Sequence, residues 1–255
     1  MHPEEIITSR DNAKLKLVRS VRDGREDALI FIEGFRLVDE AIRSGLEIDN
    51  IFLSADVGIA GRATELDSST LVEPKIFRSL SDTNNSQGII AIARRPAWTL
   101  DDISDGSVVM LHRVNNPSNL GAVVRTAEAA GVAGVITTMG AADAFSPKAL
   151  RASMGSSFRL PVIQGLSFDD LIEWARNRQL VSTAADISGN LGYTDVDWKV
   201  PRLLVFGSEA HGLDDRDLEL IDEKIVIRME NEVESLNLAL SCGIILFEAK
   251  RQRMG

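Results

Sequence analysis

Apolar residues in the first third of the chain recur either in short runs or at helical spacing. Leu15, Val18 and Val21 repeat every three positions, which predicts an amphipathic helix. Gly45 is expected to end a second helix. The predicted elements are helices at 11–22, 35–45, 58–66 and 75–80 and strands at 28–34, 48–54 and 88–95. Together they predict a compact α/β unit that closes near residue 95.

The remainder of the chain alternates regularly between strand and helix patterns. A polar stretch rich in turn formers, residues 94–106, predicts a linker, so we expect two domains, 1–97 and 98–255. The predicted strands are 107–113, 134–138, 159–164, 180–186, 203–207 and 223–229, and the predicted helices are 119–131, 146–154, 167–178 and 234–252. Such alternation predicts a parallel sheet covered by helices on both faces.

Composition is that of an ordinary globular protein. Of the 255 residues, 44% are hydrophobic and 26% are charged. The first ten residues are acidic where a signal peptide is basic, and no apolar run has the length of a membrane span, so we expect a cytoplasmic protein. The only cysteine, Cys242, lies in an apolar stretch, which favours a packed residue over a nucleophile.

The net charge of −10 argues against a protein that coats nucleic acid by bulk electrostatics. Residues 10–25 are nevertheless locally basic, with only Asp11 and Asp23 as opposing charges. The cations of this basic segment are Arg10, Lys14, Lys16, Arg19, Arg22 and Arg25. The segment is either a phosphate-binding face or a solvated helix face, and its composition does not decide between them.

Common cofactor signatures are absent from the sequence. No GxGxxG follows a strand, no GxxxxGK[ST] or HExxH occurs, and no Cys/His cluster predicts a metal. A nucleotide-dependent oxidoreductase is therefore disfavoured. Three polar clusters remain, and each directly follows an apolar strand, where a parallel α/β protein binds its ligands.

The first polar cluster begins with the sequence HRVNNPSNLGAVVRTA. We expect Asn119 to cap a helix and Arg125 to lie about one and a half turns into it. A cation this close to the positive end of the helix dipole is unfavourable for stability, which favours an anionic ligand for Arg125. The alternative is purely structural: Asn119 only caps the helix, and Arg125 only pairs with a surface carboxylate.

The second and third clusters follow two later strands. In FGSEAHGLDD, Gly207 and Gly212 allow the backbone to wrap around a ligand, and Glu209 supplies a carboxylate at the strand end. His211 is more typical of a residue in a turn than of a general base. In the third cluster, Ser235 is expected to cap the last helix.

In this order, NPSNLGAVVRTA, LLVFGSEAHGL and SLNLALSCGI resemble the three motifs of the SpoU/TrmH family of SPOUT RNA 2′-O-ribose methyltransferases. The stretch SPKALRASMGSSFRLPV also looks like that family. The front of the chain, from ITSRDNAKLKL to LSDTNNSQGIIAIARR, is similar to the family's N-terminal substrate-binding domain, an α/β module related to ribosomal proteins.

This resemblance implies an α/β fold whose parallel-sheet catalytic domain ends in a deep trefoil knot, an exception to the rule that chains are unknotted. It implies S-adenosylmethionine as methyl donor, RNA as acceptor and a homodimer whose first motif completes the site of the other subunit. The residues implied in donor binding are Gly207, Ser208, Gly212, Ile227, Met229 and Leu236, with Ser235 as a neighbour.

The resemblance also implies roles for individual side chains. Arg125 assists methyl transfer, and because a guanidinium is a poor base, positioning a phosphate and stabilising charge is its easier role. Glu209 would steer Arg125, Asn119 would orient it or the ribose, and Ser235 and Asn237 would shape the acceptor pocket. The cations Arg10, Lys14, Lys16, Arg19 and Arg22, with Arg94 and Arg95, would contact RNA.

Three positions depart from the family pattern. Arg228 and Asn231 stand where the family has proline and glycine, and Asn231 is expected to tolerate the left-handed conformation of that glycine. Ser86 replaces a common proline, which we expect to be harmless. The substrate expected by analogy is ribosomal RNA; the alternatives are tRNA and a non-catalytic RNA-binding or ribosome-assembly protein.

Overall fold

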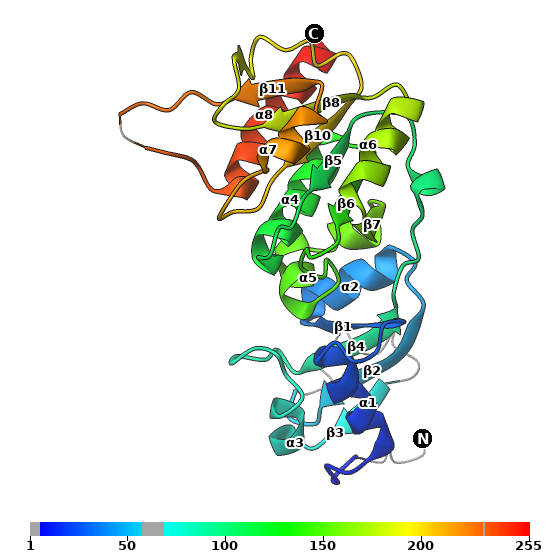
Figure 1. The fold of residues 1–255 in the computed structure, drawn as a ribbon. Coiled ribbons are helices and arrows are strands. Elements are labelled where there is room, and N and C mark those ends of the chain that lie inside the picture. Colours follow the sequence, from blue (N-terminus) through cyan, green and yellow to red (C-terminus); the bar gives the residue numbers. More distant parts are fainter. Residues whose placement is uncertain (1–5, 58–68, 232) are drawn as a thin grey trace. The chain divides into compact units, whose positions relative to one another are not determined.

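The computed structural model describes residues 6–57, 69–231 and 233–255 (Figure 1). By its internal contacts the chain divides into two compact units, Met1–Ala97 with Phe145–Phe158 and Trp98–Ala144 with Arg159–Gly255. Segment 145–158 thus groups with the first unit, although it follows the start of the second. The functional domain limits 1–97 and 98–255 stay a prediction. No helix in the described parts of the chain is long and apolar enough to span a membrane.

The first unit contains a mixed sheet of four strands in the order β1-β4-β2-β3. β4 pairs antiparallel with β1 and β2, and β3 lies parallel to β2. The elements are α1 (Ala13–Arg22), β1 (Leu29–Glu33), α2 (Phe35–Arg43), β2 (Ile48–Ser54), β3 (Ser69–Val72), α3 (Pro74–Arg78), β4 (Ile89–Arg94) and α5 (Pro147–Ser153). The predicted α/β unit is confirmed, although β3 was not anticipated, and the helix predicted at 58–66 lies outside the described residues.

Helix α1 forms as its apolar spacing predicts. Leu15, Val18 and Val21 are all buried, and burial of each apolar side chain contributes about 1.5–3 kcal/mol. The Asn12 side chain accepts a hydrogen bond from the Lys14 backbone N–H and so caps the first turn. Of the basic residues of α1, Lys14 and Lys16 are exposed, whereas Arg19 and Arg22 are half-buried.

A buried carboxylate ties the loop before β4 to β1. Glu33 is 7% exposed and accepts hydrogen bonds from the Asp82 backbone N–H at 2.9 Å, from Thr83 Oγ1 at 3.0 Å and from Ser86 Oγ at 2.8 Å, with Ser81 Oγ as a fourth donor. Four donors compensate the desolvation of the carboxylate. Ser86, where a proline is common, thus gains a bond to Glu33.

The second unit is built on seven parallel strands in the order β7-β6-β5-β10-β8-β11-β9 (Figure 1). The predicted parallel sheet is confirmed, while the short elements β9 and α7 were not anticipated. The elements are β5 (Val108–Leu111), α4 (Pro117–Ala130), β6 (Gly134–Thr138), β7 (Val162–Leu166), α6 (Phe168–Asn177), β8 (Val181–Ala185), β9 (Leu191–Gly192), β10 (Arg202–Phe206), α7 (Asp215–Glu219), β11 (Glu223–Val226) and α8 (Leu238–Met254).

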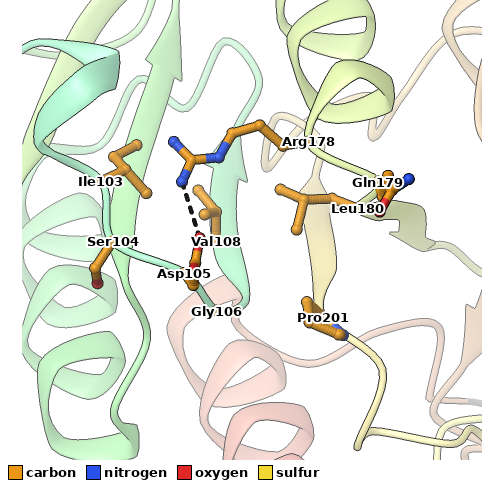
Figure 2. A pocket seen from close by; sticks show the side chains of 9 residues that line it. All are labelled: Ile103, Ser104, Asp105, Gly106, Val108, Arg178, Gln179, Leu180 and Pro201. Carbon is orange, nitrogen blue, oxygen red and sulfur yellow. Dashed lines mark hydrogen bonds and ion pairs between the residues drawn. The ribbon is translucent and has the colours of Figure 1, made fainter.

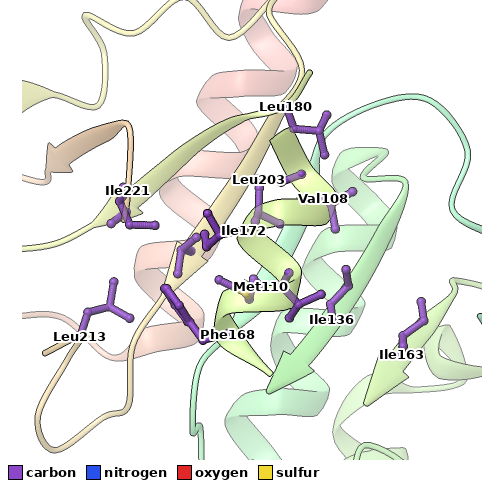
Figure 3. Close-up of a cluster of buried hydrophobic side chains, with 14 of the residues drawn as sticks. Val108, Met110, Ile136, Ile163, Phe168, Ile172, Leu180, Leu203, Leu213 and Ile221 are labelled. Atoms are coloured by element: carbon purple, nitrogen blue, oxygen red, sulfur yellow. The ribbon is translucent and has the colours of Figure 1, made fainter. Parts of the chain in front are cut away.

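Helices cover both faces of this sheet, as predicted. On one face α6 inserts Phe168, Leu171 and Ile172 against side chains such as Met110 and Ile136 (Figure 3). On the other face α4 and α8 pack against one another. This arrangement leaves the two edges at the strand ends open for loops.

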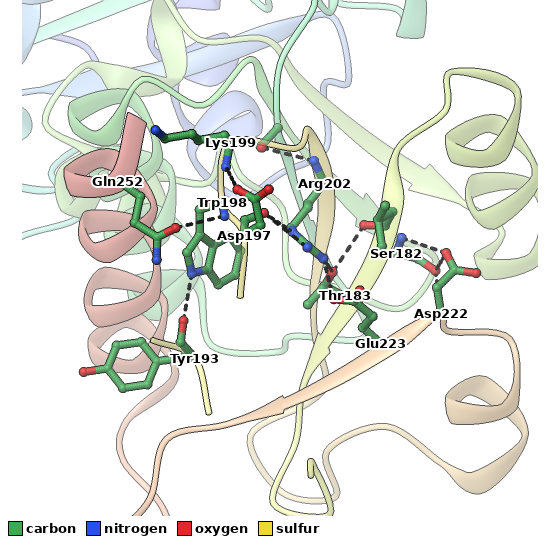
Figure 4. Close-up of polar contacts among 12 residues, drawn as sticks. Ser182, Thr183, Tyr193, Asp197, Trp198, Lys199, Arg202, Asp222, Glu223 and Gln252 are labelled. Carbon is green, nitrogen blue, oxygen red and sulfur yellow. Dashed lines mark hydrogen bonds and ion pairs between the residues drawn. The ribbon is translucent and has the colours of Figure 1, made fainter. Parts of the chain in front are cut away.

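A buried arginine joins three strands at their amino-terminal ends (Figure 4). Arg202, 4% exposed, donates to Glu223 Oε2 at 2.6 Å, to Thr183 Oγ1 at 2.8 Å and to the Asp197 carbonyl. Its guanidinium also lies 5.5 Å from the centre of the Trp198 ring. These contacts compensate the burial of the charge, so the network is a structural feature of the sheet.

Candidate functional site

The carboxyl ends of β5, β10 and β11 are followed by the three polar clusters found in the sequence. Because parallel strands end at the same edge of a sheet, their loops meet there. Asn237 Nδ2 donates to Asn119 Oδ1 at 3.1 Å, and Asn119 Nδ2 donates to Glu209 Oε1 at 3.1 Å. The other oxygen of Glu209 accepts from the Asn115 backbone N–H at 3.3 Å. We call Asn119, Glu209 and Asn237 the polar triad; it joins one residue from each cluster.

The amino terminus of α4 differs from the prediction. Asn116, not Asn119, is the N-cap, and its side chain accepts from the Ser118 N–H. The reason is Pro117, whose fixed φ and missing N–H suit the first position of a helix. Asn119 therefore lies in the first turn, with its side chain free to join the polar triad.

Arg125 also lies deeper in α4 than expected. It is the ninth residue of the helix, about two and a half turns from the start, so the argument from the helix dipole is wrong. Its side chain is exposed and makes no hydrogen bond or ion pair with any described residue. Glu209, expected to steer it, contacts Asn115 and Asn119 instead.

Helix α8 begins two residues later than Ser235 predicts. Asn237 is the N-cap, and its Oδ1 accepts from the Ala239 and Leu240 N–H groups. Asparagine is as good a cap as serine, and capping leaves Nδ2 available for Asn119. Ser235 is exposed in the preceding loop. Asn237 thus ends the loop, starts the helix and belongs to the polar triad.

Two glycines close the loop after β10. A Cβ on Gly207 would lie 2.1 Å from the Gly212 carbonyl carbon, and Gly212 has a φ of 66°. The backbone of Ser208 pairs with Gly212 in both directions, at 3.0 and 2.9 Å. Both glycines are therefore required by the tight turn itself.

The segment between β11 and α8 carries unpaired backbone. Residues 227–229 and 234–236 form no backbone–backbone hydrogen bond with the described part of the chain, and Asn231 lies in a turn. Ile227, Met229 and Leu236 are half-buried within this segment. Unpaired N–H and C=O groups next to apolar side chains suit a ligand with a heterocyclic ring and polar edges. Asn231 has a φ of 59°, as predicted, and Arg228 is exposed.

The first residue of the first cluster is a buried histidine, and sequence reasoning missed its role. His112 Nε2 lies 3.1 Å from Asp217 Oδ2, and His112 Nδ1 lies 3.1 Å from Thr138 Oγ1. Burial lowers the pKa of His112 and raises the pKa of Asp217. The only signal in the sequence was a histidine at a strand end, because Asp217 is distant along the chain.

Two residues behave as the sequence predicted. His211 is exposed in the turn, and its backbone N–H donates to Ser208 Oγ at 3.2 Å. Cys242 is fully buried, and desolvation raises the pKa of its thiol, which makes it unreactive. Among the described residues, no group of three or more His, Cys, Asp or Glu side chains is arranged to hold a metal ion.

The basic segment of α1 is only partly available for a ligand. Lys14 is exposed, while Lys16 lies 3.6 Å from Asp11 and Arg19 donates to the Arg10 carbonyl at 3.0 Å. Arg22 contacts Asp23 and donates to the carbonyls of Ser79 and Leu80. Arg22 therefore also has a structural role, at the end of α3.

A cavity of about 250 Å³ lies at the opposite edge of the second unit's sheet (Figure 2). It lies at the amino-terminal ends of β5, β8 and β10, away from the polar triad. Its lining consists of Ile103, Ser104, Asp105, Gly106, Val108, Arg178, Gln179, Leu180 and Pro201. Ligands of parallel sheets bind at the carboxyl ends, so this cavity is not the candidate site.

Two family models match the chain. The model of the SpoU rRNA methylase family matches residues 106–247, and that of an MRM3-like substrate binding domain matches residues 12–91. Relatives match over nearly the full length. A 23S rRNA (uridine(2479)-2′-O)-methyltransferase of Streptomyces viridochromogenes is 29% identical over 97% of this chain and 92% of the relative. A 23S rRNA (guanosine(2553)-2′-O)-methyltransferase of Bacillus subtilis is 28% identical over 96% of this chain and 98% of the relative.

Solved structures agree with these matches. The SpoU methyltransferase AviRb of Streptomyces viridochromogenes, in complex with the cofactor AdoMet, matches with a TM-score of 0.87 and 27% identity. The match covers 96% of this chain and 99% of AviRb. The family model covers all three clusters of the candidate site, and the relatives and the solved structure match over the same residues. The chain belongs to the SpoU rRNA methylase family.

Proposed function

We propose that this protein transfers the methyl group of S-adenosylmethionine to a ribose 2′-hydroxyl of ribosomal RNA. The observation that carries the proposal is the polar triad, which joins the three family motifs at one sheet edge beside the unpaired backbone of residues 227–229 and 234–236. The named relatives act on 23S rRNA at the 2′-oxygen, on uridine in one case and guanosine in the other. The fold alone therefore does not determine which nucleotide is methylated.

Residues of the second and third clusters fit the donor. Ile227, Met229 and Leu236 offer apolar contacts to a ring, and the backbone around Gly207, Ser208 and Gly212 offers polar ones. When bound, S-adenosylmethionine supplies an electrophilic methyl group on a sulfonium. No glycine fingerprint is needed, because the donor has no pyrophosphate to hold.

The acceptor side rests on the polar triad and Arg125. A ribose hydroxyl is a weak acid, so it must be held in line and its developing charge stabilised. Asn119, held by Glu209 and Asn237, orients the ribose, and Ser235 and Asn237 shape the pocket. Arg125 is permanently charged, so it holds the RNA phosphate and stabilises negative charge instead of acting as a base. Discrimination against DNA follows from the need for the 2′-hydroxyl.

The complete site belongs to a homodimer in this proposal. Arg125 has no described partner in its own chain, and α8 exposes Leu240 at 54% and Phe247 at 49%. A second copy would cover these apolar side chains and bring Arg125 to the donor site of its partner. A trefoil knot formed by the segments around β10, β11 and α8 is part of the same proposal.

Recognition of RNA is assigned to the first unit and the sheet edge. Arg10, Lys14, Lys16, Arg19 and Arg22, with Arg94 and Arg95, would contact the RNA backbone. Arg22 would do so by exchanging its ion pair with Asp23 for a phosphate, because Ser79 and Leu80 occupy the rest of its guanidinium. A cytoplasmic location, where ribosomal RNA is accessible, belongs to the proposal.

The experiment is transfer of labelled methyl from S-adenosylmethionine to total RNA, followed by RNA fractionation and nucleoside analysis. Wild type is expected to produce a 2′-O-methylated nucleoside in ribosomal RNA, and Arg125→Ala is expected to lose it. Arg176→Ala, which removes an exposed arginine from α6 together with its hydrogen bond to the Leu220 carbonyl, is the control and should retain activity. A methylated base would overturn the assignment of the acceptor. Donor binding without transfer would favour a non-catalytic RNA-binding protein.

A further inference from the structure

Arg113 adopts a backbone conformation that its residue type seldom takes. Its φ is 52°, in the left-handed region. The other described non-glycine residues with positive φ have an ordinary explanation. Met154 and Gln179 lie at helix carboxyl ends, where this conformation is common, and Asn231 is an asparagine. Arg113 instead follows a strand, β5, at the edge that carries the polar triad.

A buried polar network holds Arg113 in this conformation. Its backbone N–H donates to Thr138 Oγ1 at 3.1 Å, and the same oxygen lies 3.1 Å from His112 Nδ1. His112 in turn contacts Asp217, and both side chains are buried. The network determines where the chain leaves β5, and therefore where the Arg113 side chain begins.

Within the described part of the fold, the side chain makes only one long, exposed ion pair. It is 61% exposed, and its nearest described carboxylate oxygen, Asp214 Oδ2, lies 3.9 Å away. Asp214 already caps α7 through its other oxygen, which accepts from the Asp217 N–H at 2.9 Å. A glycine would adopt the same backbone without strain, so the fold alone does not require an arginine here.

We propose that Arg113 binds a phosphate of the RNA strand that enters the candidate site, and that this contact contributes to substrate affinity. The inference rests on the proposed function, which supplies an RNA ligand at this edge. Arg113 lies two residues before Asn115, whose N–H binds Glu209 of the polar triad. A guanidinium on a fixed backbone offers paired donors that match the oxygens of a phosphodiester.

The experiment measures binding of a 23S rRNA transcript at several salt concentrations, together with the KM for RNA in the methyl-transfer assay. Arg113→Gly keeps the backbone conformation and removes the guanidinium. Loss of one phosphate contact is expected to reduce the slope of log affinity against log salt by about one and to raise the KM about tenfold. Arg113→Lys should retain the slope, because the charge remains.

The matched control is Gln179→Gly, which relieves the same kind of backbone strain at the opposite edge of the sheet, where Gln179 lines the cavity of Figure 2. It should leave the salt slope and the KM unchanged. A wild-type slope and KM in Arg113→Gly would overturn the role of Arg113. Absence of methyl transfer in wild type would instead overturn the proposed function, so the two failures are distinguishable.

Discussion

Asn119 uses both ends of its side-chain amide in the polar triad. Its Oδ1 accepts from Asn237 and its Nδ2 donates to Glu209, each at 3.1 Å. An amide accepts through its oxygen and donates through its nitrogen, whereas a carboxylate only accepts. The chemical identity of this one residue therefore fixes the direction of every bond in the triad.

Replacement of Asn119 by aspartate tests this point. Asn119→Asp keeps the acceptor for Asn237 but places a second carboxylate against Glu209. Loss of a hydrogen bond to a charged group costs about 1.5–3 kcal/mol, which corresponds to roughly a ten- to hundredfold loss of methyl transfer. Single-turnover transfer to ribosomal RNA measures the effect.

Asn116→Asp is the control for that substitution. Asn116 caps the same helix three residues earlier, and aspartate caps equally well, so activity should stay near wild type. Equal activity of both variants would show that the direction of bonding at Asn119 is irrelevant.

At the scale of elements, the sheet is fastened at the edge opposite to the polar triad. Arg202 connects β10 with β8 and β11 through Thr183 and Glu223 (Figure 4). Removal of one partner of a buried ion pair is costly, because the other charge remains. The amino-terminal edge is thus expected to contribute more to stability than to catalysis.

Arg202→Ala should destabilise the protein by roughly 3 kcal/mol, at the lower end of the range for buried pairs because Glu223 is 36% exposed. Arg216→Ala removes an exposed pair with Asp169 and should cost less than about 1 kcal/mol. Urea unfolding compares the two variants. Equal effects would contradict a structural role for the Arg202 network.

Helix α8 carries a pH-dependent contribution to stability. Hydrogen bonds from Arg251 and Gln252 lower the pKa of Glu248 from 4.5 to about 2. A carboxylate with a lowered pKa stabilises the fold above its unfolded value of 4.5, and this contribution is lost as the pH falls towards 2.

Glu248→Gln should therefore be less stable than wild type at pH 7, and the difference should shrink as the pH falls below 4.5. Thermal unfolding between pH 7 and pH 3 measures the change. Glu173→Gln, at an exposed position of α6 without a described hydrogen-bond partner, should parallel wild type. A difference for Glu248→Gln that is constant with pH would exclude the linkage.

Elements with a strong apolar period were predictable from the sequence, while short ones were not. The spacing of Leu15, Val18 and Val21 identifies α1, whereas β9 has only two residues and no pattern. The helix starts were misplaced because Ser235 and Asn119 are good caps by type. The actual N-caps are Asn237 and Asn116, and Asn116 takes this position because Pro117 follows it.

Only the part of the candidate site that follows from strand order was predictable from the sequence. Loops after parallel strands share an edge, so the convergence of Asn119, Glu209 and Asn237 follows from strand order. The contact between His112 and Asp217 depends on α7, a five-residue helix with no signal in the sequence. Arg125, which the family resemblance puts in the site, remains unpaired within the described chain.

For the whole molecule, the exposed apolar side chains of α8 predict an association between copies. Phe247→Asp places a charge on this surface and should convert the proposed dimer into monomers, with loss of methyl transfer because Arg125 no longer reaches a second subunit. Sedimentation velocity measures the oligomeric state. Ile42→Asp, at an exposed apolar position on α2, should leave both properties unchanged. A monomeric wild type with full activity would contradict the dimer.

Segment 145–158 constrains how proteins of this architecture can recombine. The segment contributes α5 to the first unit, where α5 packs against β1, and Ala149 and Leu150 are completely buried. A genetic exchange that replaced only the first 97 residues would give β1 a new surface and leave α5 with the old one. The first unit is therefore expected to be inherited in two pieces of sequence, which must change together to keep the packing of α5 against β1.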